Sequence, residues 1–341
     1  SLVKQNKEVI VDLACGMAVL RGAHVYKQGI MGAPHSLRAE DIISVYADLD
    51  GKCLKGLMTV YGGMKLFVGN GIAQVSRTDL FNANSNESSG IGILMSNPVY
   101  DAPSLAEVSL TWVYAQNLPS ITCVHVLDPQ KGELILDMCA APGGKTAHIA
   151  AVMNNQGRVV ALEKSKERTR KMEHLKSECI EVYTFDSVNA AVDHADSDCG
   201  PPFPPAIFDR ILVDAPCSAL GQRPCYVNKI SVNQLKSFPV IQHKLLLTAV
   251  QLLKPGGVLV YSTCTITREE NEDQVSKLLA KCPCIELVST PFKLGGDGLQ
   301  GSNLTEEQRS MVQRFDPTST KLKDIYNVDT IGFFIAKFVK K

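Results

Sequence analysis

One stretch constrains the fold of this chain most strongly: residues 134–149, with the sequence LILDMCAAPGGKTAHI. Its apolar start predicts a buried strand, its small residues from Ala140 to Gly144 predict a turn, and a helix is expected from about Lys145. A tight strand-to-helix turn with two glycines lets the backbone approach a ligand and directs helix N–H groups at it. Three ligand classes compete for this turn: a nucleoside triphosphate, a dinucleotide and S-adenosylmethionine.

The first two ligands fit the spacing of the glycines poorly. Gly144, Lys145 and Thr146 resemble the end of a phosphate-binding loop, but that loop needs a glycine where the chain has Cys139. A dinucleotide fingerprint needs three spaced glycines, and only the adjacent pair Gly143 and Gly144 is present. An ordinary strand–turn–helix without a ligand is the remaining alternative for this stretch alone.

Length and composition indicate a soluble protein of two domains. The 341 residues exceed the usual size of one domain, and 45% hydrophobic residues allow a sizeable core. The formal net charge is zero, so a nucleic acid would have to bind through local patches. No apolar run is long enough to cross a bilayer and no signal peptide opens the chain, which starts at Ser1 and is expected to be a fragment or a processed form.

Cysteine usage points to a reducing compartment. The eleven cysteines are odd in number and spread along a chain without a secretory signal, which favours free thiols. No pair of Cys-x-x-Cys motifs occurs, so a structural zinc is not expected. We therefore predict a cytoplasmic protein without a metal or a membrane contact, and we expect a monomer.

Residues 1–94 are predicted to form a small β domain. Short β-rich runs separated by glycines indicate a small barrel. The predicted strands cover residues 9–11, 18–20, 42–46 and 65–68, with a short helix over 38–41. The barrel resembles a PUA domain, an RNA-binding module, in residues 16–26 with the run VLRGAHVY at 19–26, in residues 41–45 and in residues 69–71.

The PUA resemblance implies an RNA-binding surface. Cations would contact phosphates, and an exposed aromatic ring could stack on a base. The candidate residues are Arg21, Tyr26, Lys55 and Arg77.

Residues 95–341 are predicted to form an α/β domain, with residues 95–130 as a bridging segment. The bridge contains an expected helix over 107–118, whose Trp112 is assigned to the core. From Gly132 onward, strands and helices alternate, which is typical of a Rossmann-like, mostly parallel sheet. The predicted strands are 134–138, 158–163, 181–186, 208–214, 258–264 and 331–338, and the later helices are 166–179, 243–253 and 269–281.

Acidic residues stand where these strands end. Ligands of open α/β sheets bind outside the carboxyl ends of the strands, where Asp137, Glu163, Asp186 and Asp214 fall. Glu163 is placed to bind both ribose hydroxyls, and Asp186 can accept from an adenine amino group. These acids would repel phosphates but suit the cationic sulfonium and ammonium of S-adenosylmethionine.

Two cysteines end neighbouring strands and suggest a reaction. Cys217 follows the strand over 208–214, and Cys264 ends the strand over 258–264, so both thiols should open onto the cofactor pocket. Carbon-5 of cytosine becomes nucleophilic enough to accept a methyl group once a thiolate has added to carbon-6. A pair of thiols beside a methyl donor therefore favours cytosine methylation.

Residues 91–341 resemble the NSUN family of RNA cytosine-5 methyltransferases. The motifs that carry the resemblance are DMCAAPGGKT at 137–146, FDRILVDAPCS at 208–218, YSTC at 261–264 with ENE at 270–272, RFDP at 314–317 and GFF at 332–334. The resemblance implies a class I methyltransferase domain with a mostly parallel seven-stranded sheet. The family motif commonly continues with glycine where this chain has Ala219, which we expect to alter the loop.

The resemblance also implies roles for the site residues. Cys264 would be the nucleophile and Cys217 would assist elimination, whereas DNA cytosine methyltransferases use the cysteine of a Pro-Cys motif as nucleophile. Asp214 would contact the target cytosine as an acid, with Lys145 nearby. S-adenosylmethionine would be held by Cys139, Ala140, Ala141, Pro142, Gly143, Gly144, Lys145, Glu163, Asp186 and Asp214.

The expected substrate is RNA, and most specifically tRNA including its 3′ end. The PUA-like domain before the catalytic domain suggests a target cytosine near the acceptor end. Because a stacked base is out of reach, this cytosine should be unpaired, terminal or flipped out. The alternative is a non-catalytic RNA-binding protein with a vestigial cofactor site.

Overall fold

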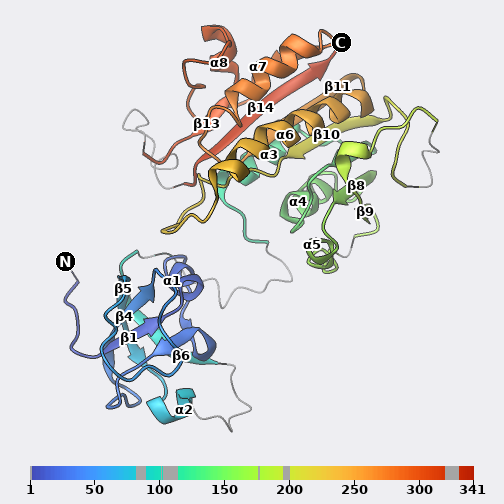
Figure 1. The fold of residues 1–341 in the computed structure, drawn as a ribbon. Helices are drawn as coiled ribbons and strands as arrows, with labels where there is room; N and C mark the ends of the chain where they lie inside the picture. Colours follow the sequence, from blue (N-terminus) through green and yellow to red (C-terminus); the bar gives the residue numbers. More distant parts are fainter. Residues whose placement is uncertain are drawn as a thin grey trace. The chain divides into compact units, whose positions relative to one another are not determined.

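The computed structural model describes residues 2–81, 90–100, 102, 114–175, 177–194, 200–318 and 330–341. The chain divides into two compact units (Figure 1). One contains residues 1–113 with 224–228, and the other contains residues 114–223 with 229–341. Among the described residues, no helix combines the length and apolarity that a bilayer crossing requires.

The N-terminal unit is built on a six-stranded sheet in the order β2-β6-β5-β4-β1-β3. The strands are β1 (Glu8–Val11), β2 (Val25–Tyr26), β3 (Ile30–Gly32), β4 (Ile42–Asp48), β5 (Lys65–Ala73) and β6 (Ile91–Pro98). The helical elements are α1 (Leu13–Val19), η1 (Lys27–Gly29) and α2 (Arg77–Phe81). Apolar side chains from the strands, among them Val9, Ile43 and Val68, form one buried core.

Three details of this unit differ from the sequence-based expectation. The predicted strand over 18–20 overlaps α1, which forms because the Asp12 side chain accepts from the Cys15 N–H at 2.7 Å and caps the helix. Residues 38–41 form a turn instead of a helix, with Asp41 accepting from the Arg38 N–H at 2.8 Å. β6 extends past residue 94 because its residues from Met95 to Pro98 pair with β5.

The second unit is built on an eight-stranded sheet. Seven strands follow the order β12-β14-β11-β10-β7-β8-β9, and β13 pairs with β14. The strands are β7 (Leu134–Asp137), β8 (Arg158–Glu163), β9 (Ile180–Thr184), β10 (Phe208–Asp214), β11 (Leu253–Thr263), β12 (Ile285–Val288), β13 (Gln313–Phe315) and β14 (Phe333–Lys340). The five strands from β11 to β9 are parallel, and β14 runs antiparallel to β11.

Helices cover both faces of this sheet, as a buried parallel sheet requires (Figure 1). The helices are α3 (Leu118–Leu127), α4 (Gly144–Val152), α5 (Lys166–Arg170), α6 (Val232–Leu252), α7 (Glu272–Lys281) and α8 (Glu306–Met311). Alternate strand residues separate two cores: Leu136 packs with residues of α6 and α7, whereas Ile135 packs with residues of α3 and α4. The carboxyl ends of the strands are thus held from both sides.

The lengths of two helices in this unit differ from the sequence-based expectation. The helix predicted over 166–179 is regular only from Lys166 to Arg170. The helix predicted from His243 begins eleven residues earlier at Val232, because Ser231 and Gln234 form a capping box and Pro239 is accommodated inside it. Most of the helix expected over 107–118, including Trp112, lies outside the described residues.

Candidate active site

The turn between β7 and α4 takes the shape predicted from its glycines. Gly143 caps α4 with a positive φ of 101°, a conformation that favours glycine. A β-carbon at Gly143 would stand 2.6 Å from Leu175 Cδ1, and one at Gly144 would stand 2.6 Å from the Tyr114 ring. Both glycines are therefore needed for close packing, and the N-terminus of α4 opens toward the strand ends.

The predicted cofactor acids and both thiols line one cavity. This cavity has a volume of about 670 Å³, which suits a nucleoside-sized ligand. Its lining residues include Cys139, Ala141, Glu163, Asp186, Asp214, Cys217 and Cys264. Ala140, Pro142, Gly144 and Lys145 line a second cavity of about 220 Å³, which shares Cys139, Ala141 and Asp214 with the first. The structure thus gathers the predicted cofactor and catalytic residues around adjoining spaces, with the exception of Gly143, which lines neither cavity.

The two predicted adenosine-binding acids are oriented by cations. Glu163 is 4% exposed, accepts from the Ser165 N–H at 2.9 Å and is ion-paired with Arg168 at 3.1 Å. Arg168 also donates to the Ala141 carbonyl at 2.6 Å, which ties the acid to the glycine turn. Asp186 is ion-paired with Lys164 at 2.7 Å.

Asp137 supports the fit of a cationic ligand. It is 1% exposed, and Thr146 Oγ1 donates to its Oδ2 at 2.8 Å, but its Oδ1 has no hydrogen-bond partner among the described residues. Burial raises the pKa of Asp137 to about 6. A buried carboxylate oxygen without a donor, on the wall of the smaller cavity, suits a ligand with an ammonium group such as S-adenosylmethionine.

Asp214 and Lys145 form an ion pair between the two cavities. Lys145 Nζ lies 2.7 Å from Asp214 Oδ2, and the Ser262 hydroxyl donates to Asp214 Oδ1 at 2.7 Å. Burial disfavours the charge on Lys145, but the Asp214 carboxylate outweighs it and raises the pKa of the lysine. Lys145 is therefore a stable cation, positioned by β10 and α4.

The two thiols are in contact. Cys217 and Cys264 are both partly buried, and their Sγ atoms lie 3.3 Å apart. The hydrogen bond that Cys217 donates lowers the pKa of Cys264, with help from Gln222 and the charge of Lys145 against the effect of burial. The same hydrogen bond, followed by burial, raises the pKa of Cys217. Cys264 is thus the better thiolate of the pair.

This assignment predicts the pH dependence of alkylation. Because Cys264 loses its proton below the ordinary cysteine pKa of about 8.5, iodoacetamide should modify Cys264 before Cys217, with a pH midpoint below that value. Peptide mass spectrometry across the pH range measures both rates, and the exposed Cys225 provides an internal reference. Replacing Cys217 with alanine should raise the midpoint of Cys264, and an unchanged midpoint would contradict the hydrogen bond.

The loop that carries Cys217 contains a strained residue. Ala219 has a positive φ of 54°, in the left-handed region that costs a residue with a β-carbon about 1–2 kcal/mol. The expectation that alanine at this position alters the loop therefore has a physical basis. The Gly221 N–H donates to the Cys264 carbonyl at 3.0 Å, so the same loop contacts both thiol-bearing segments.

The four predicted RNA-binding residues have different environments in the N-terminal unit. Arg21 is exposed, and Tyr26 is 47% exposed. Lys55 is exposed and donates to the Gln28 carbonyl at 2.8 Å. Arg77 donates to the carbonyl oxygens of Ala33, Gly56 and Leu57 and lies over the Phe81 ring, so its donors stabilise the fold. The geometry of Arg77 argues against a phosphate contact.

Comparison with known proteins identifies the family. Residues 124–339, more than half of the chain, match the family described as 16S rRNA methyltransferase RsmB/F. The chain belongs to this methyltransferase family. It is 47% identical to the tRNA (cytosine(72)-C(5))-methyltransferase NSUN6 of Mus musculus and 48% identical to that of Homo sapiens, in each case over 100% of this chain and 76% or 77% of the relative.

A solved structure supports the fold and the cofactor. The crystal structure of NSun6 from Pyrococcus horikoshii with SFG has a TM-score of 0.77 and 31% sequence identity, over 99% of this chain and 78% of that chain. The predicted α/β methyltransferase class, the use of S-adenosylmethionine and the resemblance to the NSUN enzymes are thereby confirmed.

Sequence reasoning missed several residues that organise the site. Ser262 orients Asp214, Arg168 orients Glu163, and Gln116 lines the smaller cavity. Arg168 carried a weak signal, because it stands one turn into the charged segment after the second strand. Ser262 and Gln116 gave none, since serine and glutamine occur on most surfaces.

Proposed function

We propose that this enzyme transfers a methyl group from S-adenosylmethionine to carbon-5 of a cytosine near the acceptor end of tRNA. The observation that supports this most directly is the cavity that Glu163 and Asp186 share with Cys217 and Cys264. Relatives that match over the whole chain are named for cytosine 72 of tRNA, and we extend that position to this chain. The non-catalytic alternative is not favoured, because the complete set of reactive side chains is present.

Cys264 begins the proposed reaction. Its thiolate forms a bond to carbon-6 of the cytosine, and the electrons of the carbon-5–carbon-6 double bond shift toward carbon-4 and ring nitrogen N3. The Lys145 cation, held 2.7 Å from Asp214, stabilises the charge that develops at N3, and we assign the proton that N3 takes up to this pair. Carbon-5 then carries the electron density that a methyl acceptor needs.

Cys217 acts in the second half of the reaction. Bound S-adenosylmethionine supplies the methyl group as an electrophile. Cys217 Sγ lies 3.3 Å from Cys264 Sγ, and therefore close to carbon-5 of a base attached to Cys264. Once Cys264 is bonded to carbon-6, the thiolate that raises the pKa of Cys217 is gone, so the Cys217 thiol can lose its proton to water. The Cys217 thiolate then takes the carbon-5 proton, the electrons of that C–H bond restore the carbon-5–carbon-6 double bond, Cys264 leaves carbon-6 as a thiolate, and N3 returns its proton to the Lys145–Asp214 pair.

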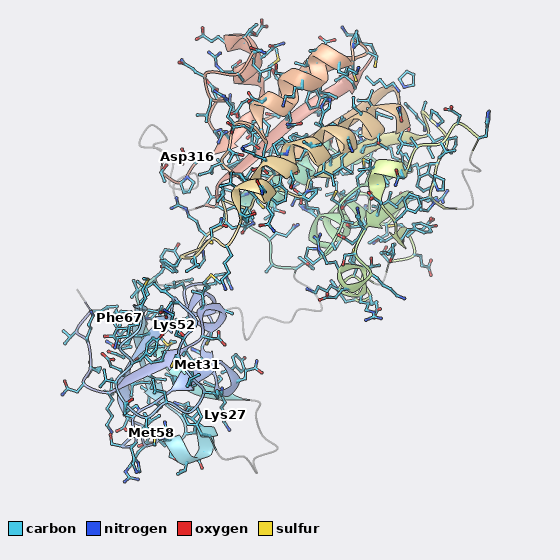
Figure 2. All side chains as sticks on the ribbon, in the orientation of Figure 1. Lys27, Met31, Lys52, Met58, Phe67 and Asp316 are labelled. Carbon is cyan, nitrogen blue, oxygen red and sulfur yellow. The ribbon has the colours of Figure 1, made fainter. Side chains whose placement is uncertain are left out.

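We propose that the N-terminal unit is a PUA-like barrel that binds the RNA. Its surface offers exposed Arg21, Tyr26 and Lys55, and the segment between β4 and β5 adds Met58, which is 58% exposed (Figure 2). Cations and accessible apolar side chains together suit an unpaired RNA strand with splayed bases. We further propose that the enzyme acts as a monomer in the cytoplasm.

The cofactor assignment predicts the effect of Glu163→Gln. A carboxylate that accepts from two ribose hydroxyls loses charge-assisted bonds when it becomes an amide, so the Kd for S-adenosylmethionine should rise about 10- to 100-fold. Isothermal titration calorimetry measures this, with Glu167→Gln on the exposed side of α5 as the matched control. Equal affinities of the two variants would rule out the ribose contact.

Methyl transfer to defined transcripts tests the proposed substrate. Labelled S-adenosylmethionine and a tRNA transcript with cytosine at position 72 should give stoichiometric incorporation by the wild-type enzyme. A transcript with uridine at that position, and otherwise identical, should give none. Equal incorporation into both transcripts would refute the proposed target.

A further inference from the structure

Close to the two thiols lies a buried carboxylate that the proposed chemistry does not use. Glu270 is 1% exposed and stands in the loop between β11 and α7. Its Oε2 accepts from the Ser218 backbone N–H at 2.9 Å and from Gln242 Nε2 at 3.0 Å. Its Oε1 accepts from the Ser218 hydroxyl at 2.6 Å and from the Thr267 hydroxyl at 2.8 Å. With the Thr265 hydroxyl, which donates to Oε1 at 3.4 Å, five donors converge on one carboxylate.

Four of the five donors come from the segments that carry the thiols. Ser218 directly follows Cys217, and Thr265 directly follows Cys264. The hydroxyls of Ser218 and Thr265 lie 2.6 Å apart, and Glu270 Oε1 is within 3.4 Å of the Thr265 hydroxyl. Glu270 therefore bridges the loop after β10 and the loop after β11.

Helix α6 completes the network. Gln242 is fully buried, and its Nε2 donates both to Glu270 and to the Pro216 carbonyl at 2.9 Å. Pro216 precedes Cys217, so the peptide of this cysteine is held on both sides. The Tyr261 hydroxyl donates to the Glu270 carbonyl at 2.6 Å and fixes the backbone of the acid itself.

Burial of a charged side chain between two loops costs free energy unless a counter-ion or hydrogen-bond donors compensate for it. The neighbouring Glu272 is also buried, but Arg314 neutralises it through bonds of 2.9 and 2.8 Å. Among the described residues, no ion pair involves Glu270, so its charge depends on the five donors alone. Separation of the two loops would leave that charge unsatisfied, and the network therefore resists any change in their spacing.

We propose that Glu270 is a positioning residue for methyl transfer, which holds the loops of Cys217 and Cys264 at the spacing that keeps the two thiols in contact. This inference rests on the proposed function, because it assumes that both thiols act on one base. Glu270 itself does not reach the cavity, and it acts through Ser218 and Thr265.

The test compares Glu270→Gln with the same substitution at Glu181. In glutamine an NH2 group replaces one of the two carboxylate oxygens. This group donates hydrogen bonds and cannot accept them, so at least one bond from Ser218 or Gln242 is lost. We expect kcat to fall about 100-fold, as it does for a misplacement of about 1 Å, while the affinity for S-adenosylmethionine stays within about twofold. The pH midpoint for alkylation of Cys264 should rise, because its bond from Cys217 weakens.

Glu181→Gln is the matched control. Glu181 is bonded to Arg158 at 2.9 Å and to the Tyr183 hydroxyl at 3.0 Å. It lies near the start of β9, an edge strand, whereas the thiols follow the ends of the inner strands β10 and β11. This variant should keep both the kcat and the alkylation midpoint of the wild type. A folded Glu270→Gln enzyme that also keeps both values would overturn the inference.

Ser218→Ala keeps the inference testable if Glu270→Gln does not fold. It removes one hydroxyl donor and leaves the other four donors of the carboxylate in place, so kcat should fall about 10-fold. Wild-type kcat in Ser218→Ala would contradict the positioning role. Absence of tRNA methylation by the wild-type enzyme would instead refute the proposed function, and the alkylation midpoints would still decide the role of Glu270.

Discussion

Replacement of Cys264 with alanine should abolish methyl transfer. Without a sulfur atom to add to carbon-6, carbon-5 of the cytosine does not become a nucleophile, and the rate should fall by about 10⁴-fold or more. The affinity for S-adenosylmethionine should remain, because Glu163, Asp186 and the glycine turn are unchanged. Methylation of a tRNA transcript with labelled cofactor measures the rate, and calorimetry measures the cofactor affinity.

A matched variant shows whether the loss is specific. Cys284 is exposed and lies just before β12, which is at one end of the strand order. The strands β8 and β9, which lead to Glu163 and Asp186, are at the other end. Cys284→Ala should keep the wild-type rate. A Cys264→Ala enzyme that still methylates at a rate near that of Cys284→Ala would eliminate Cys264 as the nucleophile.

Replacement of Cys217 with alanine should trap the enzyme on its RNA. The Cys264 adduct still forms and still accepts a methyl group, but the base that removes the carbon-5 proton is missing. A covalent protein–RNA complex should therefore accumulate and survive denaturing electrophoresis, while turnover stops after one event. The trapped species should carry one labelled methyl group for each protein molecule.

The double variant Cys217→Ala/Cys264→Ala is the control for this experiment. It should give no complex, because no thiol remains to attack carbon-6. The opposite pattern, in which Cys264→Ala traps RNA and Cys217→Ala does not, would reverse the two roles. That outcome would place the chain with the chemistry of DNA cytosine methyltransferases, which use the Pro-Cys cysteine as nucleophile.

The strands of the catalytic unit could be predicted from the sequence, and with them the place of the site residues. Each central strand is a short apolar run that ends in an acid or leads to a thiol, so the parallel order alone brings these side chains to one edge. β10 follows the predicted range, and β7 and β8 differ from it by one residue at most. The residues that the sequence could assign are those whose place depends on strand ends.

The hydrogen bonds between loops could not be predicted from the sequence. Glu270 was visible as part of a motif, but its five donors include groups from segments up to 52 residues away. No local pattern announces such a convergence, because each donor is an ordinary serine, threonine or glutamine. Arg77 is a second example. Its positive charge suggests a contact with RNA, but the structure shows that its guanidinium donates to three backbone carbonyl oxygens and stabilises the fold.

Local capping explains the errors in secondary structure. The run around Ala18 has apolar residues that suit a strand, but Asp12 provides a helix cap that begins α1. Pro239 reads as a helix breaker, yet α6 passes through it because a capping box begins the helix earlier and the second half is buried. In both regions tertiary packing and capping outweigh intrinsic propensity.

The most direct test of the account is bisulfite mapping of tRNA after reaction with the enzyme and S-adenosylmethionine. Unmodified tRNA would be incubated with the wild-type enzyme or with Cys264→Ala, and cytosines that resist conversion would be located by sequencing. The account predicts resistance at cytosine 72 of the acceptor stem with the wild-type enzyme alone. Resistance confined to other positions, or no difference between the two enzymes, would contradict it.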